Sequence, residues 1–332
     1  MSSANLYEAI SGILTTETNS SGDAAGRLSS RLYVVLDASR NELLVPTLQG
    51  YNSDATCLYS GSALEEFGDD APWLAEIKPS ESTLDWLLGE GLGQRWCTFF
   101  TSPLDMAALR LHLKKFIRVE RPDRSRVFFR FFDPQVISSY LRFFSQEQRR
   151  QFFQGFSKIS FEFGQMGFMT VSLEENSRLY WRLLQKTDQG DVNTSDGFIA
   201  PPPSDVTSGS AAKPIFIFSQ QQLELPVILN GALLIDELID YLEDDFQPRM
   251  NLYPKGMLYM MLDYGIHLAI KVYKITDLTH IKLFVGLMWR VAPGFHKEPE
   301  LNAVLRRTDI PAEQRFDQIL EPQYENGRAK AQ

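Results

Sequence analysis

Hydrophobic residues form short β-favouring runs in the first half of the chain and recur at helical spacing in the second half. The run at residues 31–37 is apolar for too long to have one solvent-facing side, which predicts a central strand. Strands that alternate with helices predict an α/β N-terminal lobe, a mixed sheet with flanking helices. The expected strands are residues 31–37, 56–60, 71–78, 96–101, 127–132, 158–164 and 168–173, and the expected helices are residues 83–88, 104–115, 134–144 and 146–155.

The second half of the chain has the pattern of amphipathic helices, with apolar stripes along residues 233–242, 257–268 and 278–288. These stripes predict a mainly α-helical C-terminal lobe. The methionine-rich second stripe is expected to face the core, and an exposed surface for partners of varied sequence is the alternative. The predicted organisation is a flexible lead-in at 1–30, an α/β domain at 31–186, a flexible linker or loop at 187–213, a helical lobe at 214–325 and a tail at 326–332.

The composition limits the classes of protein to which this chain can belong. With 332 residues and 44% hydrophobic content, the chain can bury a core in about two domains. A net charge of −9 argues against nucleic acid or an anionic membrane as the main partner. Cys57 and Cys97 lie in apolar runs and are expected to be buried thiols in a reducing compartment. Neither a signal peptide nor a membrane span of roughly 18 apolar residues is evident, so we expect a cytoplasmic protein.

The charges are distributed unevenly along the chain. Eleven basic residues lie between positions 110 and 153, where they outnumber the acidic ones by more than two to one and alternate with many aromatic residues. Between positions 219 and 248 there are seven acidic residues and no Lys or Arg. The two segments could face each other, or each could meet an outside partner of opposite charge.

A phenylalanine-rich run at 127–134 predicts a buried strand followed by a helix. Asp133 is the expected N-cap and Pro134 the first helical residue, where the missing amide costs nothing. Arg130 needs a partner, because an interior guanidinium is unfavourable without one. Asp37 ends a strand and could be catalytic, but capping a turn or pairing with Arg130 is favoured. We therefore assign structural roles to Asp37, Arg130, Asp133 and Pro134.

Residues that commonly carry catalysis or hold metal ions are few and scattered. No Gly-x-Ser-x-Gly elbow is present, and neither cysteine has the setting of a nucleophile. The glycines at 89–93 follow a helix instead of a strand, the wrong order for a phosphate cradle. We expect no catalytic residue, no metal and no cofactor. The four histidines, His112, His267, His280 and His296, lack the spacing of metal ligands.

Several short blocks follow one another in a definite order, among them the motif at 129–134, which reads Phe-Arg-Phe-Phe-Asp-Pro. In order and spacing the blocks resemble the effector adaptor-chaperone family of bacterial type VI secretion systems, long described as a domain of unknown function. The resemblance is dense over residues 31–144 and looser beyond; residues 1–30 and 187–213 depart from it. The blocks are residues 32–38, 58–66, 71–77, 86–88, 100–105, 109–116 and 129–136, followed by 269–273 and 293–295.

The resemblance implies a cytoplasmic, non-enzymatic protein of a Gram-negative bacterium. Such a protein binds a toxic effector, keeps it soluble before secretion and helps load it onto the valine-glycine-repeat (VgrG) spike protein at the tip of the injection tube. The C-terminal lobe would then be the cargo-specific part. The alternatives are an immunity protein that neutralises a toxin, and a hydrolase or nuclease with an unfamiliar site.

Opposite charges orient a partner, so we expect the effector's N-terminal segment to lie between the lobes, against the acidic helix at 233–247 and the basic segment. Large aromatic residues and arginines are the usual anchors of an interface. The expected contacts are the outward charges Arg110, Arg142, Arg149 and Arg150, the apolar anchors Phe152 and Phe153, the second-rank contacts Trp73 and Tyr140, and the acids Asp240 and Asp244.

Overall fold

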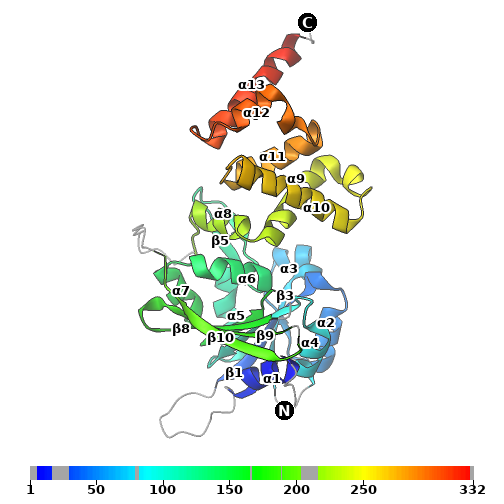
Figure 1. Cartoon of the computed structure of the whole chain (residues 1–332). Coiled ribbons are helices and arrows are strands. Elements are labelled where there is room, and N and C mark those ends of the chain that lie inside the picture. The colour runs from blue at the N-terminus through cyan, green and yellow to red at the C-terminus, as the bar shows by residue number, and fades with distance from the viewer. Residues whose placement is uncertain are drawn as a thin grey trace. The chain divides into compact units, whose positions relative to one another are not determined.

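The computed structural model describes the backbone of residues 6–16, 30–78, 82–164, 167–187, 189–202 and 216–329. Side chains are described within those ranges except at positions 62, 66, 69, 244 and 321–329. The chain forms two compact units, residues 1–222 and residues 223–332 (Figure 1).

An eight-stranded sheet forms the centre of the first unit, and each pair of neighbouring strands in it is antiparallel. The predicted class, a sheet with flanking helices followed by a helical C-terminal region, is confirmed, with antiparallel pairing where a mixed sheet was expected. The strand order is β10 (Val192–Ile199), β9 (Leu179–Lys186), β8 (Gly167–Leu173), β7 (Lys158–Glu162), β4 (Cys97–Ser102), β1 (Arg31–Asp37), β3 (Pro72–Ile77) and β2 (Thr56–Cys57).

Strands β1 and β4 lie in the buried middle of this sheet, as their continuous apolar sequences predict. All residues of β4 are buried, and Arg31 is the one exposed position of β1. Alternate side chains of these strands point to opposite faces. On one face, Val34 and Phe99 join a core to which the helices α1 (Leu6–Thr16), α2 (Leu44–Tyr51) and α4 (Thr83–Gly91) contribute.

The opposite face of the sheet carries an aromatic core. The Phe100 ring of β4 packs 4.9 Å from Phe156 and 6.3 Å from Phe131, measured between ring centroids. His112 packs so closely on Gly155 that a Cβ there would lie 2.2 Å from the imidazole, which explains a glycine at that position. The helices of this side are α5 (Met106–Leu113), α6 (Pro134–Tyr140) and α7 (Gln146–Phe153).

The first unit contains a small second sheet. Its hairpin consists of β5 (Arg118–Glu120) and β6 (Arg126–Phe128). Residues 216–218 add to the other side of β5, because the Glu120 amide donates to the Phe216 carbonyl (2.9 Å) and the Phe218 amide donates to the Glu120 carbonyl (3.0 Å). The strand that was expected over residues 127–132 is shorter in the structure, because β6 ends at Phe128. Beyond it the chain turns inward so that Phe131 and Phe132 are buried.

Two boundaries predicted from composition are wrong. Residues 6–16 of the expected flexible lead-in form α1, whose Leu6, Ile10 and Leu14 are buried at helical spacing. Residues 192–199 of the expected linker form β10, an edge strand. An edge strand pairs on one side only and can remain polar, so its composition resembles that of a loop. Residues 1–5, 17–29 and 203–213 lie outside the described part of the chain.

The second unit is helical, as predicted. Its core is built from α9, α10 and α11, whose buried side chains include Leu238, Leu262 and Phe284. The expected tail begins later than residue 326, because the last helix continues to Ala329. The helices are α8 (Gln220–Ile228), which starts in the first unit, α9 (Gly231–Met250), α10 (Lys255–His267), α11 (Leu278–Arg290), α12 (Pro299–Leu305) and α13 (Ala312–Ala329).

Three residues of the methionine stripe of α10 face outward, contrary to the core position expected for them, whereas Met261 is half-buried and Leu268 is buried. Met257, Met260 and Tyr264 are at least half exposed, whereas Leu258 and Leu262 are buried. Two overlapping apolar stripes on this helix both have helical spacing. The neighbouring helices decide which stripe is buried, and spacing alone could not.

Candidate functional site

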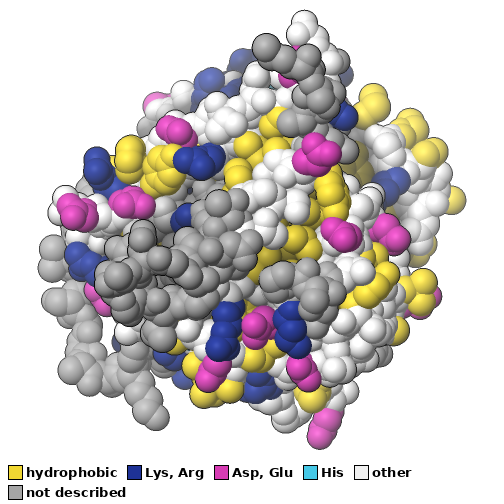
Figure 2. Space-filling model, turned by 90° about the horizontal axis from the view of Figure 1, so that it is seen from below, with side chains coloured by type: hydrophobic (Ala, Val, Ile, Leu, Met, Phe, Trp, Pro, Cys, Tyr) yellow, Lys and Arg dark blue, Asp and Glu magenta, His cyan; other side chains and the backbone are white. Residues whose placement is uncertain are grey.

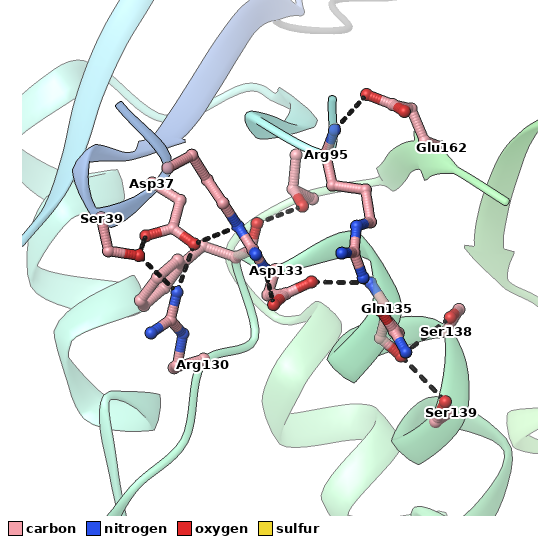
Figure 3. Close-up of polar contacts among 12 residues, drawn as sticks. Asp37, Ser39, Arg95, Arg130, Asp133, Gln135, Ser138, Ser139 and Glu162 are labelled. Atoms are coloured by element: carbon pink, nitrogen blue, oxygen red, sulfur yellow. Dashed lines mark hydrogen bonds and ion pairs between the residues drawn. The ribbon is translucent and has the colours of Figure 1, made fainter. Parts of the chain in front are cut away.

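A buried charge cluster lies where β1 ends (Figure 3). Asp37 is fully buried, and its Oδ2 accepts a 2.5 Å hydrogen bond from Arg130 Nη2. Ser39 Oγ donates to the other carboxylate oxygen at 2.8 Å, and Arg40 Nε lies 3.3 Å from Oδ2. Arg40 also pairs with Asp133 through Nη2. Two aspartates and two arginines thus join the end of β1 to the start of α6.

The contacts of these residues lie within the fold. Asp133 is the N-cap of α6, since its Oδ1 accepts from the Gln135 amide at 2.9 Å, and Pro134 occupies the first turn. Burial of Arg130 disfavours its charge, but the adjacent Asp37 carboxylate outweighs this and raises the pKa of the guanidinium. The carboxylate of Asp37 is thus engaged by cations and a hydroxyl group, an arrangement that stabilises the joint between strand and helix.

A second, half-buried acid is visible in the same close-up. Glu162, the last residue of β7, accepts hydrogen bonds from the amides of Gly93 (2.8 Å) and Arg95 (3.1 Å). Burial raises the pKa of Glu162, and the two amides partly offset that effect. This carboxylate holds the turn between α4 and β4, where Arg95 has a φ of +57°. Among the described residues, no group of His, Cys, Asp and Glu is arranged to hold a metal ion.

An exposed groove lies beside the hairpin. Its volume is about 210 Å³, and Phe128 of β6 forms part of its wall with 42% of its surface exposed. The Phe128 ring lies 5.5 Å from Tyr59 and 5.9 Å from Phe67 of α3 (Ser62–Phe67). We call this site the hairpin groove; it is lined by Leu58, Tyr59, Ser60, Ala63, Lys114, Ile117, Arg118 and Phe128.

The hairpin next to this groove carries exposed positive charge. Arg118 stands over the Phe128 ring, with its Cζ 4.9 Å from the centroid. Within the described residues, no carboxylate forms an ion pair with Arg118, Arg121 or Arg126, and all three are exposed. Arg124 differs, because it pairs with Glu120 at 2.8 Å. On the face of the molecule shown in Figure 2, by contrast, basic and acidic side chains lie next to each other.

Three of the predicted contact residues are buried, so their assignment as a partner surface is wrong. Phe152 and Phe153 belong to the aromatic core, where Phe152 packs 5.1 Å from Phe116 and from Phe156. Arg149 is fully buried, and burial lowers its pKa to about 10. Its guanidinium donates to the backbone carbonyls of Phe144 (3.1 Å), Ser177 (2.9 Å), Ile199 (2.8 Å), Arg142 (3.0 Å) and Ala200 (3.0 Å).

Other predicted contacts in the first unit are partly accessible. Arg150 is exposed 3.8 Å from Glu147, and Arg142 is exposed over the ring of Phe143. Arg110 is half-buried and donates through Nε to the Cys57 carbonyl at 2.9 Å. Two aromatic residues expected as second-rank contacts, Trp73 and Tyr140, are half-buried against the core residues beside them.

The acidic segment is partly neutralised within the second unit. Lys282 and Arg290 of α11 pair with Glu237 and Asp245 of α9, respectively. Asp240 lies at the surface, where only part of its carboxylate is shielded from water. This partial burial, together with the neighbouring acids, raises the pKa of Asp240. The side chain of Asp244 lies outside the described part of the chain. That the basic and acidic segments contact one cargo stays a prediction.

The residues that make up the hairpin groove were missed in the sequence. A usable signal was present, because Pro122 and Asp123 mark a turn between two short stretches rich in arginine. Turn residues between β-capable stretches predict a hairpin, and charged residues at alternate positions of a hairpin face solvent. Tyr59 carried no such signal, since only the tertiary fold places it beside Phe128.

Residues 32–151 match the family model "Domain of unknown function (DUF4123)", a family associated with type VI effector adaptors. The matched region contains the hairpin groove and the charge cluster around Asp37. No curated protein and no solved structure matches the chain. In the part of the chain that the structure describes, every helix is too short or too polar to cross a membrane.

Proposed function

We propose that this chain is a non-enzymatic adaptor-chaperone of a type VI secretion system. It binds a toxic effector in the cytoplasm of a Gram-negative bacterium, keeps the effector soluble, and helps load it onto the valine-glycine-repeat spike protein. The observation that carries this proposal is the match of residues 32–151 to a family associated with type VI effector adaptors.

The exposed surface inside the matched region supports binding of a polypeptide. The hairpin groove, at about 210 Å³, is smaller than the roughly 300–1,000 Å³ of typical small-molecule sites. Its wall combines an exposed aromatic ring with arginine, two kinds of side chain that are enriched where proteins meet, and it also contains a lysine. Such a groove has room for individual side chains of a partner.

Deletion of the gene in the native host tests the proposal. We expect the effector encoded beside it to disappear from the culture medium, while the tube protein of the secretion system is still secreted. Expression of the chain from a plasmid restores effector secretion. Unchanged effector secretion in the deletion strain contradicts the adaptor function.

The same strain distinguishes the adaptor from an immunity protein. Loss of an immunity protein leaves cells open to their own toxin, so the deletion strain would be killed by neighbouring wild-type cells. Loss of an adaptor leaves survival unchanged. Co-purification of both the effector and the spike protein with the tagged full-length chain is the biochemical counterpart, because an immunity protein needs no contact with the spike.

A further inference from the structure

The hairpin leaves one of its two edges open. Residues 216–218 occupy the outer side of β5, so the free edge of this small sheet is β6. The Phe129 amide donates to the Ile117 carbonyl and the Arg121 amide donates to the Ser125 carbonyl, which identifies the hydrogen-bonded pairs of the hairpin. Hydrogen-bonded and non-hydrogen-bonded pairs alternate in an antiparallel ladder. Arg126 and Phe128 therefore turn their backbone amides and carbonyls away from β5.

Those outward groups have no partner within the described part of the chain. An unpaired strand edge is a template on which another chain can add a strand. The side chains beside this edge determine which partner strand it can bind. Those of Arg126 and Phe128 are both exposed and lie on the same face of β6. A strand added there would run beside Phe128 and hence beside the hairpin groove.

The charges around this edge select the partner. Arg118, Arg121 and Arg126 are exposed without an ion-paired carboxylate among the described residues, and Lys114 lines the groove. Exposed charges on an edge strand oppose pairing with a neutral or basic strand. The same charges favour an acidic strand, since cross-strand pairs of opposite charge are stabilising.

We propose that β6 binds an extended, acidic segment of the partner protein by strand addition, with an apolar partner side chain in the hairpin groove. This inference rests on the adaptor function proposed above and identifies the chemistry of the segment that the adaptor binds. Backbone hydrogen bonds supply affinity, and the groove and the arginines supply specificity.

A peptide in which Glu and Val alternate is the probe, labelled with fluorescein and titrated with the full-length chain. We expect binding that weakens as NaCl rises from about 0.05 to 0.5 M, because the charges are exposed. The corresponding Lys-Val peptide should not bind. A Glu-Val peptide with N-methylated amides should bind at least about tenfold more weakly, since it lacks donors for the strand edge.

Variants of the chain locate the binding edge. Arg126→Pro removes the outward amide at the first position of β6, where proline is tolerated, and Arg126→Ala is its control for the lost charge. We expect Arg126→Pro to bind the Glu-Val peptide about tenfold more weakly than Arg126→Ala. Thr194→Pro makes the same change on β10, the edge of the large sheet, and should leave peptide binding unchanged. Equal urea midpoints establish that the variants remain folded.

Three outcomes of the peptide titrations overturn strand addition at β6. They are failure of the Glu-Val peptide to bind at low salt, equal binding of the Lys-Val peptide, and loss of binding in Thr194→Pro instead of Arg126→Pro. If Arg126→Pro unfolds, the N-methylated peptide still tests the backbone contact on the intact chain.

Co-purification of the neighbouring effector separates strand addition from the adaptor function. If the effector co-purifies with Arg126→Pro as well as with the wild type, strand addition fails and the adaptor function survives. If the effector does not bind the wild type, the adaptor function itself fails, whatever the peptides do.

Discussion

Two stretches of the basic segment both contain arginines and phenylalanines but place them differently in the structure. In residues 114–128 the arginines lie on a hairpin and are exposed, and three of them have no ion-paired carboxylate in the described part of the chain. In residues 130–153 the arginines at positions 142 and 150 are exposed, but those at 130 and 149 bind buried acceptors, and the phenylalanines at 152 and 153 fill the aromatic core. Density of charge along a sequence therefore does not identify which charges are accessible.

The difference between the stretches has a physical origin. A guanidinium can be buried if its five N–H donors all find acceptors, and Arg149 meets this condition with five backbone carbonyls. A short hairpin has no interior in which to supply such acceptors. Its arginines remain in water, where they are available to a partner.

The largest loss of folding stability is expected at Arg149, the fully buried arginine. Arg149→Ala should lower the free energy of unfolding by about 3–5 kcal/mol, because carbonyls of the α6–α7 connection, of the β8–β9 connection and of the end of β10 lose their common donor. Urea denaturation followed by circular dichroism measures the loss. Arg150→Ala, one residue away and exposed, is the control and should change stability by less than about 0.5 kcal/mol. Equal losses for the two variants would contradict the assignment.

A smaller loss is expected from the charge cluster. Asp37→Asn should cost about 2–3 kcal/mol, since Arg130 and Arg40 would lose a charged acceptor that is fully buried. Arg130→Ala should cost less, because its side chain is 42% exposed and Ser39 and Arg40 still contact Asp37. Thermal unfolding of the two variants provides the ranking. A melting curve unchanged by Arg130→Ala would show that this pairing does not stabilise the fold.

Acid should destabilise the core through His112. Burial lowers the pKa of this histidine below its ordinary value of 6.5, and the neutral ring donates through Nε2 to the Phe152 carbonyl at 2.9 Å. The unfolded chain then binds the proton more readily, so stability is complete above about pH 6.5 and falls as the pH drops below it. Urea midpoints at pH 7.5, 6.5 and 5.5 measure the slope. His112→Gln keeps a donor but does not titrate, and its slope should be flatter; an identical slope would exclude His112 as the cause.

The smallest effect on folding stability is expected for the exposed arginines of the hairpin. Arg118→Ala and Arg121→Ala should each change the free energy of unfolding by less than about 0.5 kcal/mol, because both arginines are exposed on the hairpin. Urea denaturation of the single variants checks this. A loss above about 1 kcal/mol would mean that these arginines hold the fold together, and the comparison between the two stretches would then fail.

Local chemistry was predictable where a short motif determines its own structure. The cap formed by Asp133 and Pro134 and the buried strands β1 and β4 follow from residue types and spacing alone. The pairing of Asp37 with Arg130 was also accessible, because a buried charge requires a partner and few candidates existed. Strand β10 was not predictable, since a polar edge strand and a polar loop have the same composition.

The sequence by itself determined the class of fold, the division into a sheet-containing part and a helical part, and the local caps, because these depend on periodicity and on neighbouring residues. Only the tertiary structure decided which arginines are buried, which stripe of α10 is exposed and which residues surround the hairpin groove. Those outcomes depend on contacts between segments far apart along the chain, and no local pattern encodes which acceptor or apolar surface a side chain will meet.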